Sequence, residues 1–248
     1  KRIVAEKILL PTDVVAGDFN KDGLTDLASI SFENNEVYQH IQQSNGTFLK
    51  STIATKVFRP RKLLAIDFNQ DSEIDIAVAS EEDNSIRILF SEANNFWDEK
   101  LLTEGATGTR NMASCDLDDN GLGDLVVSHS GSDELYAYYN YGIWPYQPQL
   151  IDNSAPGVNA VLCMDLNNNG QNDIAAIHAR EGNIYSYFQN EGFKKTLVAN
   201  TRDGYITLNA ADFLQVNEIQ LLTQAHFQQR NFLYKPTALN VEQVIWQD

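Results

Sequence analysis

The chain has 248 residues, of which 43% are hydrophobic, and its formal net charge is −16. This length suffices for one large all-β domain or two small ones, and the hydrophobic content is ordinary for a globular protein. The acidic balance argues against a nucleic-acid partner, because phosphate binding requires clustered lysine and arginine. No apolar run approaches the length of about 18 residues that a membrane-spanning helix needs, so we expect no membrane span.

A strand is expected first at residues 3–10, and the chain then repeats one plan. In each unit a short strand enters an acidic loop, a second strand leaves it, and two more strands follow after polar turns. The units cover about residues 12–55, 61–104, 110–152, 159–200 and 205–248. Alternating apolar and polar residues, with turn residues at short and regular intervals, are typical of an all-β protein.

The repeated unit predicts the fold class: an all-β β-propeller of four-stranded blades, with five repeats in a single domain over residues 1–248. A blade cannot bury both faces alone, so its neighbours must cover them. We favour a closed five-bladed ring, with part of a larger propeller as the alternative. Residues 3–10 and 241–246 together leave one outer strand surplus, which is available for self-association between chains.

The acidic loops share a fixed spacing of oxygen-bearing side chains, at positions 1, 3, 5 and 9. They begin at Asp18, Asp67, Asp116 and Asp165, each 49 residues after the one before. Position 6 is glycine in three of them and Ser72 in the second, and glycine there permits a sharp turn with positive φ. A decayed copy begins at Asp212, has apolar residues at positions 3 and 5, and is expected to hold no metal.

Carboxylate and amide oxygens at alternate positions of a tight loop converge on one point, which suits a hard cation such as calcium. The first half of each loop is like an EF-hand, but position 12 lacks the required glutamate and the last carboxylate stands at position 9. We therefore interpret each loop as a calcium-clamped hairpin between two strands, with about four ions in the chain. The alternative is a turn rich in Asp, Asn and Gly that binds no metal.

These loops resemble the FG-GAP/VCBS repeats of integrin α-subunit propellers and of many secreted bacterial proteins. The resemblance rests on the pattern D-x-[DN]-x-[DN]-G-x-x-D between two strands and covers essentially the whole chain. It implies calcium ligation by the side chains at positions 1, 3, 5 and 9 and by the backbone carbonyl at position 7. The residues so implicated are Asp18, Asn20, Asp22, Leu24 and Asp26; Asp67, Asn69, Asp71, Glu73 and Asp75; Asp116, Asp118, Asn120, Leu122 and Asp124; and Asp165, Asn167, Asn169, Gln171 and Asp173.

The chain departs from that family in lacking its Phe-Gly and Gly-Ala-Pro signatures and in having fewer repeats than is usual. Ser72 in place of glycine is expected to strain the second site. The fourth site has carboxylates only at Asp165 and Asp173 and is expected to be the weakest of the four.

The two cysteines, Cys115 and Cys163, stand one and two residues before the first aspartates of their loops. Residues one apart in strand register point to opposite faces. We therefore expect two separate small buried thiols and no disulfide.

A candidate ligand surface comprises Arg59, Arg61, Arg110, His129, Trp144, His178, Arg202 and Tyr205. The arginines and aromatics lie mostly in or near the connections between units, which line the mouth of a propeller. His129 and His178 lie five residues after the last aspartates of their loops, near the opposite face. They are either polar strand ends or a paired metal or catalytic site.

The sequence favours a calcium-stabilised binding or adhesion module for a protein or a glycan, in an extracellular or cell-surface location. An export signal is not visible, and we expect that it has been removed. We expect no enzymatic activity, because no nucleophile-elbow, zinc-protease or phosphate-loop motif occurs. The alternatives are an accessory or catalytic domain of a polysaccharide-active enzyme, or a structural subunit of an extracellular assembly.

Overall fold

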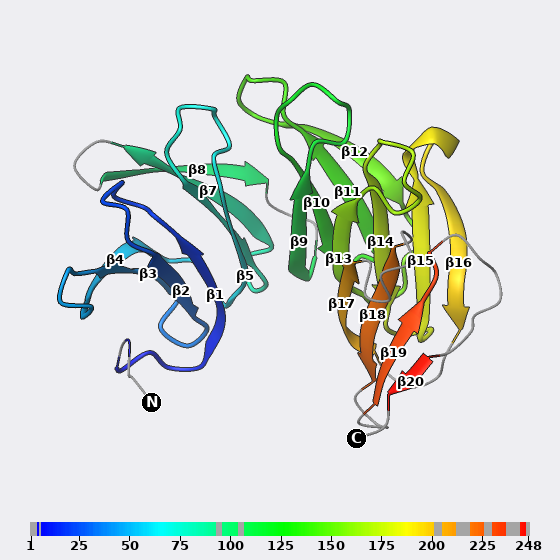
Figure 1. Ribbon diagram of the computed structural model, residues 1–248, viewed down its shortest axis with the longest axis horizontal. Helices are drawn as coiled ribbons and strands as arrows, with labels where there is room; N and C mark the ends of the chain where they lie inside the picture. The colour runs from blue at the N-terminus through cyan, green and yellow to red at the C-terminus, as the bar shows by residue number, and fades with distance from the viewer. Residues whose placement is uncertain are drawn as a thin grey trace. The chain divides into compact units, whose positions relative to one another are not determined.

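The computed structural model describes residues 4, 6–92, 96–103, 107–200, 205–211, 219–225, 230–236 and 244–246. The chain forms two compact units, Lys1–Arg110 and Asn111–Asp248. The boundary falls at the start of the third repeat. The first unit holds two sheets and the second holds three (Figure 1).

Each sheet has four antiparallel strands in chain order. The first sheet comprises β1 (Pro11–Gly17), β2 (Asp26–Ser31), β3 (Glu36–Gln42) and β4 (Phe48–Thr55), and the second comprises β5 (Pro60–Ile66), β6 (Asp75–Ser80), β7 (Ser85–Glu92) and β8 (Phe96–Thr103). The third comprises β9 (Thr109–Cys115), β10 (Asp124–His129), β11 (Glu134–Tyr139) and β12 (Gln147–Asp152), and the fourth comprises β13 (Val158–Met164), β14 (Asp173–His178), β15 (Asn183–Phe188) and β16 (Lys194–Asn200). The fifth comprises β17 (Tyr205–Ala211), β18 (Gln220–Ala225), β19 (Arg230–Tyr234) and β20 (Val244–Trp246).

Five four-stranded antiparallel sheets confirm the predicted fold class, a β-propeller built of such blades. Within the described residues the one helical element is a 3₁₀ turn, η2 (Gln189–Glu191). No helix in this part of the chain has the length and apolar character needed to cross a membrane. Closure of the blades into a ring stays a prediction.

The strand predicted at residues 3–10 is wrong for the part of that segment that the structure describes, which has no strand at residue 4 or at residues 6–10. Lys7 and Leu10 have φ angles of 63° and 45°, in a region that is incompatible with an extended strand. The first strand begins only at Pro11. Every described strand therefore belongs to a sheet of four, and the surplus outer strand expected for self-association does not arise from this segment.

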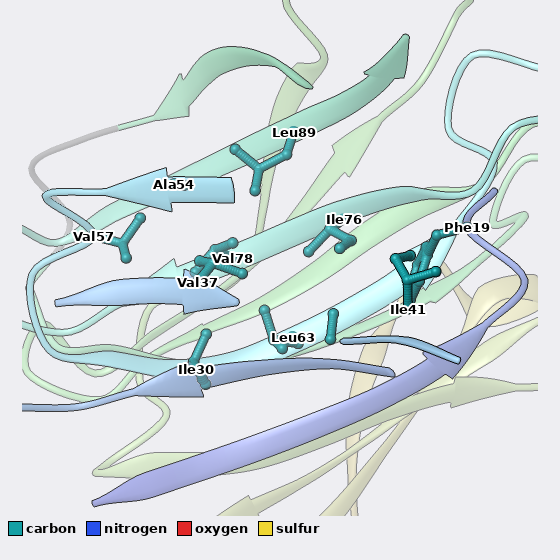
Figure 2. Close-up of a cluster of buried hydrophobic side chains, with 11 residues drawn as sticks. Phe19, Ile30, Val37, Ile41, Ala54, Val57, Leu63, Ile76, Val78 and Leu89 are labelled. Carbon is teal, nitrogen blue, oxygen red and sulfur yellow. The ribbon is translucent and has the colours of Figure 1, made fainter. Parts of the chain in front are cut away.

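The second strands of the first four blades are buried on both faces, and β6, β10 and β14 are buried along their whole length. Blades cover one another, so these strands are short apolar runs and do not alternate with polar residues. Ile30 and Val37 of the first sheet share one core with Leu63 and Val78 of the second (Figure 2). Equivalent cores join the third sheet to the fourth and the fourth to the fifth.

A disulfide joins Cys115 of β9 to Cys163 of β13, so the prediction of two free thiols is wrong. The two Cα atoms are 5.7 Å apart, a normal separation for a disulfide. Facing surfaces of neighbouring blades come from opposite faces of their strands. The one-residue offset that suggested divergent thiols therefore directs both side chains into the core between the third and fourth sheets.

Candidate functional site

The four acidic loops join the first strand of a blade to its second, and their side chains fold back onto the loop backbone. In the first loop, Asp18 accepts hydrogen bonds from the backbone N–H of Asp22 at 3.1 Å and of Gly23 at 2.8 Å. The Asp22 carboxylate accepts one from the N–H of Leu24 at 2.8 Å. The loop is thus a small cage with oxygen atoms gathered on its inner side.

The same cage is built in all four loops. The first aspartate of each accepts N–H groups from positions 5 and 6 at 2.7 to 3.2 Å. Position 5 accepts the N–H of position 7 at 2.7 or 2.8 Å. Because four segments of differing sequence adopt one geometry, the spacing of the oxygens, and not any single residue between them, determines the loop.

The carboxylate at position 9 is fully buried in every loop, at Asp26, Asp75, Asp124 and Asp173. One oxygen accepts the N–H of position 2, at 2.7 to 3.1 Å. The other accepts an N–H at or within one residue of the end of the third strand, at 2.7 to 2.9 Å. The position-9 carboxylate therefore ties the loop to the third strand of its blade.

Burial makes the ionised form of these carboxylates unfavourable unless another group compensates its charge. Desolvation raises the pKa of Asp75 and of Asp124 to about 6, against the backbone hydrogen bonds that lower it. The neighbouring loop carboxylates raise it further. The pKa of Asp26 and of Asp173 is raised for the same first cause. A cation among these oxygens would relieve both the burial and the repulsion.

The third loop brings its carboxylates closest together. Oxygens of Asp116, Asp118 and Asp124 all lie within 4.8 Å of one another, and this is the one cluster of three or more His, Cys, Asp or Glu ligand atoms within the described residues. In the first two loops, an asparagine at position 3 instead donates its amide to the carboxylate at position 5. The donor set and its convergence fit a hard divalent cation, which takes six to eight oxygens.

The turn residues of the loops have left-handed backbone. Gly23, Gly121 and Gly170 have φ angles of 81°, 86° and 89°, and Ser72 is held at 67°. A Cβ on any of these glycines would meet no atom within 4 Å, so glycine is required for its backbone freedom and not for space. The left-handed Ser72 agrees with the expectation of strain in the second loop.

The structure places the residues of the predicted ligand surface in several separate surroundings. Arg61 and Arg110 both donate to Glu81, through their Nε atoms at 2.6 and 2.9 Å, and Arg59 pairs with Glu82 at 3.2 Å. Burial raises the pKa of Glu81, but hydrogen bonds from the two arginines outweigh it and lower the pKa overall. Each of the three guanidinium groups therefore has a carboxylate partner within the first unit, and two of them share Glu81.

The two histidines are fully buried at the far ends of β10 and β14. Burial lowers the pKa of His129 and of His178 to about 4. His178 Nε2 lies 2.9 Å from the hydroxyl of Tyr187, which donates to Asp152 at 2.7 Å. Both imidazoles are neutral at pH 7 and are enclosed within the second unit, away from any ligand in solvent.

Trp144 is half-buried beside Tyr146, with ring centroids 5.6 Å apart, and precedes a cis proline. Arg202 lies outside the described residues, and so does most of the decayed loop that begins at Asp212. Tyr205 begins β17, but its side chain is outside what the structure describes.

Comparison with known protein families gives a match in the region of the acidic loops. The FG-GAP-like repeat family matches residues 18–78, which contain the first two loops and the strands between them. This part of the chain therefore resembles an FG-GAP-like repeat. No curated protein sequence matches it significantly.

Solved structures similar to this chain share its fold at low identity. One is virginiamycin B lyase from Staphylococcus aureus, with a TM-score of 0.64 and 10% identity over 98% of this chain and 71% of that one. Another is an Agrocybe aegerita lectin described as specifically recognising non-reducing terminal N-acetylglucosamine, with a TM-score of 0.62 and 15% identity over 91% of this chain and 63% of that one. Both likenesses concern the fold alone.

Proposed function

We propose that the protein is a calcium-stabilised propeller that acts outside the cell or at its surface as a binding or adhesion module for a protein or a glycan. The observation that carries the calcium part is the recurrence of one oxygen cage in four loops, each closed by a fully buried carboxylate. Turns that only reverse the chain have no need to bury a charge at the same position each time.

The side chains at positions 1, 3, 5 and 9 would hold the ion, with the backbone carbonyl at position 7. Bound calcium supplies positive charge that offsets the clustered carboxylates. The position-9 aspartate would then link the ion to the third strand of the blade through its second oxygen. Calcium affinity and fold stability are coupled in such an arrangement.

The extracellular location is supported by the disulfide between Cys115 and Cys163. Disulfides form and persist in oxidising compartments and are rare in the reducing cytosol. The binding role is supported by the blade architecture and by the lectin with a similar fold. We also propose that the chain binds and does not catalyse, since the imidazoles of His129 and His178 are enclosed.

Calorimetric titration of the chelator-treated protein with calcium tests the metal part. We expect about four ions per chain, with Asp124→Asn removing one of them. The matched control is Asp98→Asn, which changes an aspartate of β8 outside the loops. Titration that shows no calcium binding would leave the loops as plain turns. Screening the calcium-loaded protein against glycan and extracellular-protein arrays tests the binding role, which fails if neither array gives a saturable ligand.

A further inference from the structure

A groove of about 510 Å³ opens in the first unit between the outer strands of its two blades. Its lining includes Gln39 of β3, Leu49, Ser51 and Thr52 of β4, and Phe96 and Trp97 of β8. This volume lies in the range of small-molecule sites. None of the candidate residues drawn from the sequence belongs to it, because it is formed by third and fourth strands and not by the loops.

The lining of the groove is uncharged, although the chain has a net charge of −16. It combines apolar surface with one amide and three hydroxyl or indole groups. Phe96 and Leu49 are 64% and 65% exposed, which is unfavourable for large apolar side chains unless a ligand covers them. A charged ligand would find no opposite charge among the lining residues, whereas a neutral one with both apolar and hydroxyl surface would be matched.

Trp97 is held in place before any ligand arrives. Its Nε1 donates to Gln39 Oε1 at 3.0 Å, and its ring meets Phe19 edge-on with centroids 6.1 Å apart. Gln39 is 4% exposed, and the residues at its register position in the next three blades are Ile88, Ala137 and Ser186. An amide at a position that is otherwise apolar or small thus serves to orient the indole.

Phe19 also connects the groove to the first acidic loop. It is position 2 of that loop, and its N–H donates to the buried carboxylate of Asp26 at 3.1 Å. Phe19 is part of the buried core shown in Figure 2. Trp97 is partly buried and packs against that core. Direct contacts through Phe19 therefore connect the loop to the wall of the groove.

We propose that this groove binds a neutral oligosaccharide, with a sugar ring over Phe96 and Trp97 and its hydroxyl groups toward Ser51 and Thr52. The C–H face of a sugar provides the apolar surface that aromatic rings cover, and its hydroxyls match the side-chain donors and acceptors present. The inference rests on the proposed binding function and selects a neutral glycan among its ligands.

The test uses the full calcium-loaded chain and an array of neutral trisaccharides of N-acetylglucosamine, glucose, mannose and xylose, beside heparin and hyaluronan as acidic probes. Neutral hits are then measured by titration calorimetry. We expect Phe96→Ala to weaken binding about tenfold and Thr52→Val several-fold, in line with the loss of a central contact. The matched control, Tyr141→Ala, removes a 53% exposed aromatic from the second unit and should leave affinity within about twofold.

Several outcomes would contradict the proposed glycan site in the groove without contradicting the proposed binding function. These are neutral glycans bound equally well by both groove variants, binding of acidic glycans alone, or a protein or peptide as the sole ligand. Removal of calcium provides a separate readout: the Trp97 indole N–H resonance should shift in wild type and not in an Asp18→Asn variant, whose first loop is impaired. An unchanged resonance in wild type would show that the first loop and the groove are not coupled.

Discussion

The residue at position 6 of each loop affects the backbone conformation of the loop but is not one of its proposed ligands. Three loops have glycine there, and the second has Ser72, at a φ of 67°. Oxygen-bearing side chains occupy positions 1, 3, 5 and 9 of the second loop, and its hydrogen bonds match those of the other loops. The left-handed backbone of an L residue costs about 1–2 kcal/mol, so this loop forms at an energetic disadvantage that its neighbours do not have.

Ser72→Gly should therefore stabilise the protein. Glycine removes the steric cost but increases the entropy of the unfolded chain by about 0.5–1 kcal/mol, so we expect a net gain of up to about 1 kcal/mol in the free energy of unfolding. Urea unfolding at fixed calcium measures it. By the same balance, the reciprocal change, Gly121→Ser, should destabilise by up to about 1 kcal/mol. Equal stability of both variants and wild type would show that position 6 carries no strain.

A second prediction at this scale concerns the protonation of His178. Because burial lowers its pKa from 6.5 to about 4, the folded protein binds fewer protons than the unfolded chain between these pH values. Stability from this residue is thus fully present above about pH 6.5 and is lost as the pH falls toward 4.

Comparison with His178→Gln isolates that effect. The stability advantage of wild type over the variant should shrink by up to about 1.4 kcal/mol per pH unit between pH 6.5 and 4. The buried loop aspartates, whose raised pKa values act in the opposite direction, are the same in both proteins and cancel in the difference. Chemical unfolding at several pH values provides the measurement, and a constant difference would contradict the buried neutral imidazole.

At the scale of elements, two cross-links between the third and fourth blades supplement the core that they share. The disulfide joins the first strands, β9 and β13, near the acidic loops. Asp152, at the end of β12, accepts from Tyr187 of β15 and pairs with Lys195 of β16 at 3.0 Å. One link is thus at the first strands, and the other joins the outer strand of one blade to the third and fourth strands of the next.

Removal of the disulfide should destabilise the second unit. The two cysteines are 48 residues apart in sequence, and a bridge of this span stabilises by about 2–4 kcal/mol. We expect the double variant Cys115→Ala, Cys163→Ala to unfold at a correspondingly lower temperature in calorimetry. Reductant should lower the melting temperature of wild type toward that of the variant and leave the variant itself unchanged. If reductant lowers the melting temperature of wild type and of the double variant equally, the effect of reductant does not come from this disulfide.

Features set by nearby residues could be predicted from the sequence, and those that depend on how blades face each other could not. Each acidic loop is contained in nine residues, so its spacing sufficed to predict a hairpin between the first and second strands of a blade, while calcium binding there stays a prediction. The disulfide forms between opposite faces of strands in two neighbouring blades. The alternation of side chains along a single strand does not reveal that these two faces meet. The groove needs Gln39 and Trp97, 58 residues apart, to meet. The strand expected at residues 3–10 is the exception among the local predictions: its apolar residues suggested a strand, but Lys7 and Leu10 have positive φ.

At the scale of the whole molecule, calcium removal is expected to have the largest effect. Each site that is saturated about 100-fold above its dissociation constant adds about 2.7 kcal/mol to stability, and about 1 kcal/mol shifts the melting temperature by about 2–4 °C in a protein of this size. Excess chelator should therefore lower it by on the order of ten degrees or more. Because the exposed carboxylates left behind repel one another through solvent, high salt should recover part of that loss.

The salt dependence distinguishes a metal cage from a turn. A turn without a cation has the same carboxylates before and after chelation, so neither the melting temperature nor its response to sodium chloride would change. Readdition of calcium should restore the original value, whereas magnesium should do so poorly, because its smaller octahedral shell loses water reluctantly. Differential scanning calorimetry over a series of salt concentrations, with and without chelator, measures all of these. A melt insensitive to chelator at every salt concentration would contradict calcium binding by the loops.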